Sequence, residues 1–240
     1  MTKRWGIAID QNRCIGCWTC SVACKSINNE PLGIHWNRVL TSRPNESAPG
    51  AVPATQAIDV PSGQFPDLQL AYQPTSCQHC QNAPCEKVCP VGATFRRSDG
   101  AVLIDFERCI GCRYCMAACP YGARSFTWEK GQYPTDFAVG YGKDYRTLGR
   151  LVFTPQRPVG VAEKCTLCVE RIDDGKKPMC VEACPAGARI FGDLNDAASQ
   201  LSIAVQQQSG HRLLDDLGTD PNVFYLPVYR PNRVRSSDEE

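Results

Sequence analysis

Residues 104–119 read IDFERCIGCRYCMAAC, and a close copy of this stretch, IDQNRCIGCWTCSVAC, occupies residues 9–24. The two copies lie 95 residues apart and share an Ile-Asp pair, a Cys-Ile-Gly-Cys core and a closing Ala-Cys. A second phrase, Cys-Pro-x-Gly-Ala, occurs at residues 89–93, 119–123 and 184–188. Repetition of two phrases indicates that a small cysteine-rich unit was duplicated.

The cysteines extend this repeat over most of the 240-residue chain. They form four quartets that each close with C-x3-C. The first and third quartets are spaced C-x2-C-x2-C-x3-C, whereas the middle gap grows to four residues in the second and to eleven in the fourth. In chain order the sixteen cysteines are Cys14, Cys17, Cys20, Cys24, Cys77, Cys80, Cys85, Cys89, Cys109, Cys112, Cys115, Cys119, Cys165, Cys168, Cys180 and Cys184. Because none is left over, cysteine chemistry must organise the fold.

Three chemistries compete for these thiols: iron-sulfur clusters, zinc and disulfides. A cubane 4Fe-4S cluster needs one thiolate at each iron, and the fourth cysteine of such a run, often followed by proline, ligates the other cluster in two-cluster ferredoxins. Zinc uses pairs of ligands, which the fourth quartet could supply but the triplets that begin at Cys14 and Cys109 do not. Disulfides fit worse, because cysteines three residues apart rarely bridge one another and no secretory signal is present. The pattern therefore predicts four 4Fe-4S clusters in two ferredoxin-like lobes.

Strand signals lead into the two copies of the repeat. Residues Trp5–Ile9 and Ala101–Ile104 are alternating or β-branched, and each predicts a strand that ends shortly before the first cysteine of a copy. Ser98-Asp99-Gly100 predicts a hairpin turn ahead of the second strand. The fold class predicted from these signals is α+β, with two tandem bacterial-ferredoxin-like lobes and loop-rich insertions.

Two segments between the quartets are predicted to be the insertions. Residues 29–72 are rich in Pro, Ser, Asn and Gly, and residues 128–160 are rich in Gly and Tyr. Beyond the last quartet, Asp196 predicts the cap of a helix that runs to about Gln208, with Gly210 as its stop. Residues 222–228 predict a final strand before a charged tail.

Several functions are excluded by what the sequence lacks. No run of eighteen apolar residues is present, and the start of the chain has neither an apolar signal core nor a twin-arginine pair, so we expect no membrane span and no export signal. The motifs of P-loop, dinucleotide-binding, nucleophile-elbow and zincin enzymes are missing, so we expect no catalytic residue. The formal charge of +1 becomes about −7 if all the thiolates are ionised around four oxidised cores. No nucleic-acid partner is expected.

Basic and small residues surround the cysteines. Glycines in the C-x2-C and Cys-Pro-x-Gly-Ala loops suit close backbone approach to a cluster, or are plain turn glycines. Basic residues near the cysteines could offset cluster charge, although a solvated surface position is favoured for most of them. These residues are Lys25, Arg108, Arg113, Arg124, Lys164, Arg171 and Arg189. His79 lies between Cys77 and Cys80, but with four cysteines in its quartet it is predicted to support the ligands rather than to bind metal.

The four spacings, in the order C-x2-C-x2-C-x3-C, C-x2-C-x4-C-x3-CP, C-x2-C-x2-C-x3-CP and C-x2-C-x11-C-x3-CP, resemble those of a known family. They are similar to the iron-sulfur subunits of the dimethyl sulfoxide reductase family of molybdenum enzymes. The likeness covers most of the chain, through Cys14–Lys25, Cys77–Cys80, Cys109–Gly122 and Lys164–Asp193. Lys25 departs from the small-ferredoxin pattern, which has proline there, but similar subunits share this departure.

This resemblance implies how the ligands are shared. The first and fourth quartets would build one lobe, residues 1–28 plus 161–195, and the second and third the other, residues 73–127, with residues 196–240 as a C-terminal helix, strand and tail. The implied ligand sets are Cys14, Cys17, Cys20 and Cys184; Cys165, Cys168, Cys180 and Cys24; Cys77, Cys80, Cys85 and Cys119; and Cys109, Cys112, Cys115 and Cys89. Some relatives, such as nitrate reductase beta subunits, replace a third-quartet cysteine with Trp and hold a 3Fe-4S cluster. The intact Cys112 implies four cubanes here.

The resemblance also implies a role. The chain would be a non-catalytic subunit that relays electrons between a large molybdopterin or tungstopterin catalytic subunit and a quinone-reactive membrane subunit. The complex would be peripheral and membrane-associated, either cytoplasmic or periplasmic by co-export with a partner. The alternatives are an electron-transfer subunit of a hydrogenase or other respiratory complex, or a free polyferredoxin. The insertions are candidates either for docking surface, with Trp36, Tyr133 and Tyr141 as anchors, or for extra core over the lobes.

Overall fold

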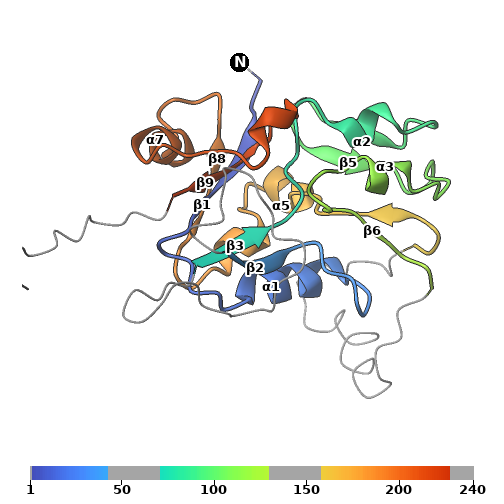
Figure 1. Cartoon of the computed structure of the whole chain (residues 1–240), viewed down its shortest axis with the longest axis horizontal. Coiled ribbons are helices and arrows are strands. Elements are labelled where there is room, and N and C mark those ends of the chain that lie inside the picture. The colour runs from blue at the N-terminus through green and yellow to red at the C-terminus, as the bar shows by residue number, and fades with distance from the viewer. Residues whose placement is uncertain (1, 43–70, 130–157, 228–240) are drawn as a thin grey trace, which may run out of the picture.

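The computed structural model describes residues 2–42, 71–129 and 158–227, in which short helices and short strands alternate (Figure 1). The helices are α1 Thr19–Asn28, α2 Pro84–Lys87, α3 Tyr114–Ala117, α5 Val169–Asp173, α6 Met179–Glu182 and α7 Gln200–Gln207, with a 3-10 turn at Asp215–Leu217. The strands are β1 Trp5–Asp10, β2 Arg38–Ser42, β3 Ala71–Thr75, β4 Thr94–Arg96, β5 Val102–Ile104, β6 Ser125–Phe126, β7 Ala162–Glu163, β8 Arg189–Asp193 and β9 Val223–Leu226. Across these ranges no helix combines the length and the apolarity that crossing a bilayer requires.

The longest sheet has three strands in the order β8-β1-β9. Its central strand β1 pairs antiparallel with β8 and parallel with β9. Successive side chains of a strand point to opposite faces. Ile7 and Ile9 accordingly pack into the larger apolar cluster, while Ala8 packs with Leu201 of α7, and each of these side chains is at most 3% exposed. The predicted strand at Trp5–Ile9 is therefore confirmed, with both of its faces buried.

A second antiparallel pair, β4 with β5, repeats part of this arrangement. The turn between its strands is closed by the N–H of Arg97, which donates to the carbonyl of Ala101 at 2.8 Å, so the predicted turn and strand are both confirmed. In each pair one strand leads into a C-x2-C loop, and the other leaves a Cys-Pro-x-Gly-Ala phrase. The β1–β8 pair thereby joins the surroundings of the first and fourth quartets, and β4–β5 joins those of the second and third. In Figure 1, β1, β8 and α7 lie to the left, while α2, α3 and β5 lie to the right.

The described ends of the first insertion form a β-hairpin rather than an irregular loop. Strands β2 and β3 pair antiparallel, with Arg38 opposite Thr75. Trp36, just before β2, is 2% exposed, and its backbone N–H donates to the Glu30 carboxylate at 2.9 Å. Of the two alternatives for Trp36, added core is confirmed and an exposed docking anchor is wrong, because this side chain is buried. Tyr133 and Tyr141 lie outside the described residues.

Helix α7 begins later than the sequence indicates. Asp196 does not cap it, because the Asp196 carboxylate accepts the N–H of Ala198 in a preceding turn. Ser199 is the N-cap, and its hydroxyl accepts the N–H of Ser202 at 3.1 Å. At the other end the left-handed residue is Ser209, with φ of +51°, and the predicted stop Gly210 follows it. Polar side chains that bond to the nearby backbone decide where this helix begins.

Candidate metal centre

The first C-x2-C loop of every quartet has the same backbone shape. The residue just before the second cysteine has a left-handed φ in all four: +68° at Gly16, +46° at His79, +69° at Gly111 and +61° at Leu167. A left-handed residue within a tight turn directs successive backbone N–H groups to one side, and such concavities bind anions, including iron-sulfur clusters. The four quartets are therefore shaped alike, although their side chains differ.

Two of these positions also need glycine for space. A Cβ atom on Gly16 would lie 2.4 Å from the ring of Tyr72, and one on Gly111 would lie 2.2 Å from the carbonyl oxygen of Gly160. Neither position has room for a side chain because other parts of the chain crowd it, and the close approach of these glycines to a cluster stays a prediction.

Backbone N–H groups reach the cysteine sulfurs in these loops. Ala188 N–H donates to Cys184 Sγ at 3.3 Å, and Leu167 N–H donates to Cys165 Sγ at 3.4 Å. Burial raises the pKa of Cys89, but the backbone N–H groups that follow it in its Cys-Pro-Val-Gly-Ala-Thr loop outweigh that effect, so the pKa lies below its usual value. At Cys89 the loop therefore favours the thiolate, which is the form that binds metal.

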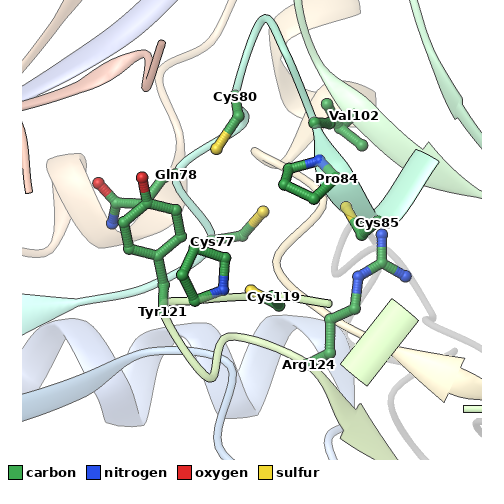
Figure 2. Close-up of a pocket in the computed structure, with 11 residues that line it drawn as sticks. Cys77, Gln78, Cys80, Pro84, Cys85, Val102, Cys119, Tyr121 and Arg124 are labelled. Carbon is green, nitrogen blue, oxygen red and sulfur yellow. The ribbon is translucent and has the colours of Figure 1, made fainter. Parts of the chain in front are cut away.

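Three cysteines of the second quartet meet the last cysteine of the third. Cys77, Cys80, Cys85 and Cys119 line one pocket, and Figure 2 shows their sulfur atoms directed into it, with Tyr121 and Arg124 at its sides. Burial and then the adjacent Cys77 raise the pKa of Cys80 to about 12, and Cys85 and Cys119 act on it in the same direction. Four thiols that crowd each other in this way form a site for a cationic group, whose binding displaces their protons.

The first and fourth quartets meet in a similar way. Burial raises the pKa of Cys14, and the thiolates of Cys20 and Cys184 raise it further. Burial likewise raises the pKa of Cys24 well above its ordinary value, with Glu30 and then Cys165 adding to the effect. Cysteines about 140 to 170 residues apart in the sequence are thus close neighbours in the fold.

Cysteines of the second and fourth quartets also lie close enough for their charges to interact. Burial raises the pKa of Cys165 well above its usual value, and the next largest cause is Cys77 of the second quartet. Burial raises the pKa of Cys115 in the third quartet, Arg124 lowers it, and Cys85 and then Cys109 raise it further. The structure therefore brings together cysteines from all four quartets in one chain of neighbouring groups.

Models of protein families support the cluster chemistry. A model described as a 4Fe-4S dicluster domain matches residues 13–93 and again residues 108–188. A second model with the same description matches residues 68–135, which contain the second and third quartets. Two dicluster domains with sixteen cysteines are consistent with four 4Fe-4S clusters.

Curated relatives cover nearly the whole chain. A Halobacterium salinarum protein, provisionally named as the iron-sulfur subunit of a dimethyl sulfoxide reductase, is 47% identical over 228 residues, 92% of this chain and 78% of its own length. The arsenate respiratory reductase iron-sulfur subunit of a Shewanella species is 37% identical over 244 residues, 93% of this chain and 96% of its own. The menaquinone reductase iron-sulfur cluster-binding subunit of Nitratidesulfovibrio vulgaris is 36% identical over 247 residues, 93% and 88% of the two chains. The chain belongs to the iron-sulfur subunits of the dimethyl sulfoxide reductase family.

As a member of this iron-sulfur subunit family, the chain transfers electrons within an oxidoreductase complex and is not itself catalytic. A 4Fe-4S cluster supplies a one-electron carrier. The residues present fit this group: the donors are soft thiolates, backbone N–H groups reach the sulfurs, and a buried cation lines the pocket of Cys77, Cys80, Cys85 and Cys119. Within the described part of the chain, Nε and Nη2 of that cation, Arg124, are buried without a hydrogen-bond partner, as donors to cluster sulfur would be.

The described residues do not form a site for a single metal ion. In residues 2–42, 71–129 and 158–227, no three His, Cys, Asp or Glu side chains lie close enough together to hold one metal ion. A cubane makes another demand, because its four thiolates bind four separate iron atoms.

Exposure separates the cysteines of this iron-sulfur subunit into inner and outer ones. Cys17 of the first quartet and Cys112 of the third are exposed. By contrast, Cys77, Cys80 and Cys24 are each less than 10% exposed. Two of the four sites therefore reach the surface of the described structure through one cysteine each.

The basic residues near the cysteines divide in a way that the sequence did not indicate. Arg108 and Arg113 are exposed, as predicted, whereas Lys25 and Arg171 are half-buried. Arg124, Lys164 and Arg189 are only 6%, 3% and 5% exposed, so the surface prediction is wrong for these three. Buried cations need nearby opposite charge or acceptors, which cysteines supply to Arg124 and Arg189, whereas the Lys164 ammonium donates to the carbonyls of Val102 and Cys165. A usable signal was present, because both buried arginines directly follow a Cys-Pro-x-Gly-Ala phrase.

His79 also lies inside the protein. Its Nδ1 accepts the backbone N–H of Val102 at 3.1 Å, and the side chain is 1% exposed. Burial lowers its pKa well below the usual value, and the charges of Lys164 and Arg124 lower it further, so the imidazole stays neutral at physiological pH. This arrangement agrees with a supporting role for His79.

Proposed function

We propose that the chain holds two clusters in each of two lobes, with ligands exchanged between paired quartets. The first lobe comprises residues 1–28 and 161–195, and the second lobe comprises residues 73–127. The proposed ligand sets are Cys14, Cys17, Cys20 and Cys184; Cys165, Cys168, Cys180 and Cys24; Cys77, Cys80, Cys85 and Cys119; and Cys109, Cys112, Cys115 and Cys89. The pairing of β1 with β8 and of β4 with β5, and the shared pocket in Figure 2, support this assignment.

The four sites form a linear relay in this proposal. The sites of Cys77 and Cys165 are the inner ones, because these two cysteines influence each other across the lobes. The sites of Cys17 and Cys112 are the outer ones, because each has an exposed ligand through which a partner can approach. The chain of neighbouring sites with an exposed cysteine at either end is the observation that carries the proposal.

The partners follow from this geometry and from the family. One outer site serves a large catalytic subunit that carries molybdopterin or tungstopterin, and the other serves a quinone-reactive membrane subunit. The name of the Nitratidesulfovibrio relative, a menaquinone reductase subunit, supports a quinone at one end. The complex is then peripheral and membrane-associated. It is periplasmic if a partner carries an export signal and cytoplasmic if none does.

Anaerobic purification of the native complex tests this function. Mass spectrometry identifies the partners, and elemental analysis measures iron, molybdenum and tungsten. We expect about sixteen iron atoms per chain, four for each cubane, with molybdenum or tungsten in a large co-purifying subunit. Nickel in the partner, or a monomer without partners, would replace the proposal with the hydrogenase or free-ferredoxin alternatives, and zinc in place of iron would end it.

A further inference from the structure

Two arginines occupy the same position in the two proposed lobes. Arg124 directly follows Cys119-Pro-Tyr-Gly-Ala, and Arg189 directly follows Cys184-Pro-Ala-Gly-Ala. Both are almost fully buried, at 6% and 5% exposed. A buried guanidinium costs free energy unless it is paired, so each of these positions needs a nearby negative charge.

Arg189 bridges two cysteines of different proposed clusters. Its Nη1 lies 3.6 Å from Cys180 Sγ, and its Nη2 lies 3.5 Å from Cys20 Sγ. Nη2 also donates to Asn37 Oδ1 at 2.9 Å, which orients the guanidinium. An arginine guanidinium is not deprotonated in proteins. The cation therefore persists between the two cluster sites of the first lobe.

Arg124 has the corresponding environment in the second lobe. It lines the pocket of Cys85, as Figure 2 shows, and Cys85 and Cys115 are the largest charges that act on it. These two cysteines again belong to different proposed clusters. Nη1 donates to Thr94 Oγ1 at 3.2 Å, and the guanidinium also interacts with the thiols of Cys85 and Cys115, although Nε and Nη2 make no hydrogen bond of ordinary geometry among the described residues. Two N–H edges are thus left for acceptors that a cluster would supply.

The third copy of the phrase explains why one arginine suffices in the second lobe. Residues 89–93 also read Cys-Pro-x-Gly-Ala, but the next residue is Thr94, which is 4% exposed. Its hydroxyl accepts from Arg124 instead of supplying a second cation. A second buried guanidinium here would face the first one, whereas threonine holds it in place.

We propose that Arg124 and Arg189 set the reduction potentials of the clusters in pairs, each guanidinium being a fixed cation shared by the two clusters of its lobe. The inference rests on the proposed ligand sets. Each reduction adds one electron, and hence one negative charge, to a cluster, and no proton needs to follow because the guanidinium is already positive. A buried positive charge beside both clusters stabilises their reduced states and raises both potentials. Arg124 and Arg189 are positioning residues for charge, not ligands.

The purified holo-complex provides the test. Arg189→Gln and Arg124→Gln remove the cation but keep a polar side chain, while Arg189→Lys and Arg124→Lys keep the charge without the fork that spans two sulfurs. Arg108→Gln is the matched control, since it removes an equal charge beside Cys109 but from an exposed side chain. Iron analysis gives the cluster content of each variant, and redox titration followed by electron paramagnetic resonance gives the four potentials.

The expected pattern is specific to each lobe. Arg189→Gln should lower the reduction equilibrium constant of both clusters of the first lobe by about tenfold or more. This change lowers each potential by about 59 mV for one electron, and the potentials of the second lobe should stay unchanged. Arg124→Gln should lower both potentials of the second lobe and leave the first lobe unchanged. Arg108→Gln should change every reduction equilibrium constant by less than about threefold, because water screens exposed charges. Each Lys variant should preserve the potential of one cluster of its pair and lower the other, because one ammonium cannot contact both sulfurs.

Several outcomes would overturn the inference. In fully loaded Gln variants, unchanged potentials, or a shift confined to one cluster of the pair, would exclude a shared cation. If the Gln variants lose iron, the Lys variants provide the test. Wild-type potentials for both clusters of the pair in a Lys variant would show that the guanidinium fork need not span the two sulfurs, and would exclude the inference. These results leave the proposed function intact as long as the wild-type complex holds about sixteen iron atoms per chain, whereas a wild-type chain without iron would refute the proposed function itself.

Discussion

Gly111→Ala tests whether the C-x2-C loops are shaped by close backbone packing. The residue has φ of +69°, and an added Cβ would meet the Gly160 carbonyl oxygen at 2.2 Å. A left-handed non-glycine residue costs about 1–2 kcal/mol, and overpacking adds about 1–3 kcal/mol. The total of about 2–5 kcal/mol corresponds to a fall of about 4–20 °C in the thermal midpoint of a chain of this size. Because the residue stands between Cys109 and Cys112, the same displacement should lower the iron content.

Gly175→Ala is the control for backbone strain alone. Gly175 has φ of +74°, but no atom lies within 4 Å of the position that an added Cβ would take. Gly175→Ala should lower the free energy of unfolding only by the cost of the left-handed backbone, about 1–2 kcal/mol, which lowers the thermal midpoint by about 2–8 °C. The assay is the visible absorbance of the clusters during anaerobic heating, at one scan rate for all variants because cluster loss is irreversible. Equal midpoints and equal iron content for the two variants would refute the packing argument.

Three further predictions concern other parts of the chain. Cys112→Ser should lose or convert one cluster, as electron paramagnetic resonance would show, and should reduce electron flow from the partner. The catalytic subunit should stay active with an artificial donor, and loss of that activity too would contradict a relay. Ser199→Ala removes the cap of the Ser202 N–H, costs about 1 kcal/mol and should lower the thermal midpoint by about 2–4 °C, so an unchanged midpoint would show that the cap contributes nothing. Burial lowers the pKa of His211, so the unfolded chain binds this proton more readily and stability should fall as the pH drops below about 6.5. His211→Gln should flatten that fall in thermal melts between about pH 7 and pH 5, and an unchanged slope would count against the assignment.

Local patterns predicted those parts of the fold that depend on neighbouring residues in the sequence. The strand at Trp5–Ile9 and the turn at 98–100 follow from alternation and turn chemistry, and the structure confirms both. The sixteen cysteines indicated the cofactor, because their spacing alone matches a cubane. The pairing of quartets into ligand sets came from the resemblance and stays a prediction, although β1 and β8 bring the relevant segments together.

Long-range contacts explain what the sequence did not reveal. Trp36 lies in a segment that reads as a loop, yet it is buried just before strand β2, whose partner strand β3 begins only at Ala71. Arg189 appeared to be a surface cation because its partner Cys20 is 169 residues away. Burial of a charged side chain depends on partners that folding supplies, and those partners are invisible in a local window.

We propose that all sixteen cysteines hold four cubane clusters and that these clusters carry electrons. Mössbauer spectroscopy of the anaerobically purified complex, combined with iron and protein analysis before and after reduction by quinol, tests it most directly. We predict about sixteen iron atoms per chain, all in 4Fe-4S clusters, with a reducible fraction that is reoxidised when the substrate of the catalytic partner is added. A 3Fe-4S component in the intact protein, markedly less iron, or clusters that quinol and substrate leave unchanged would contradict the account.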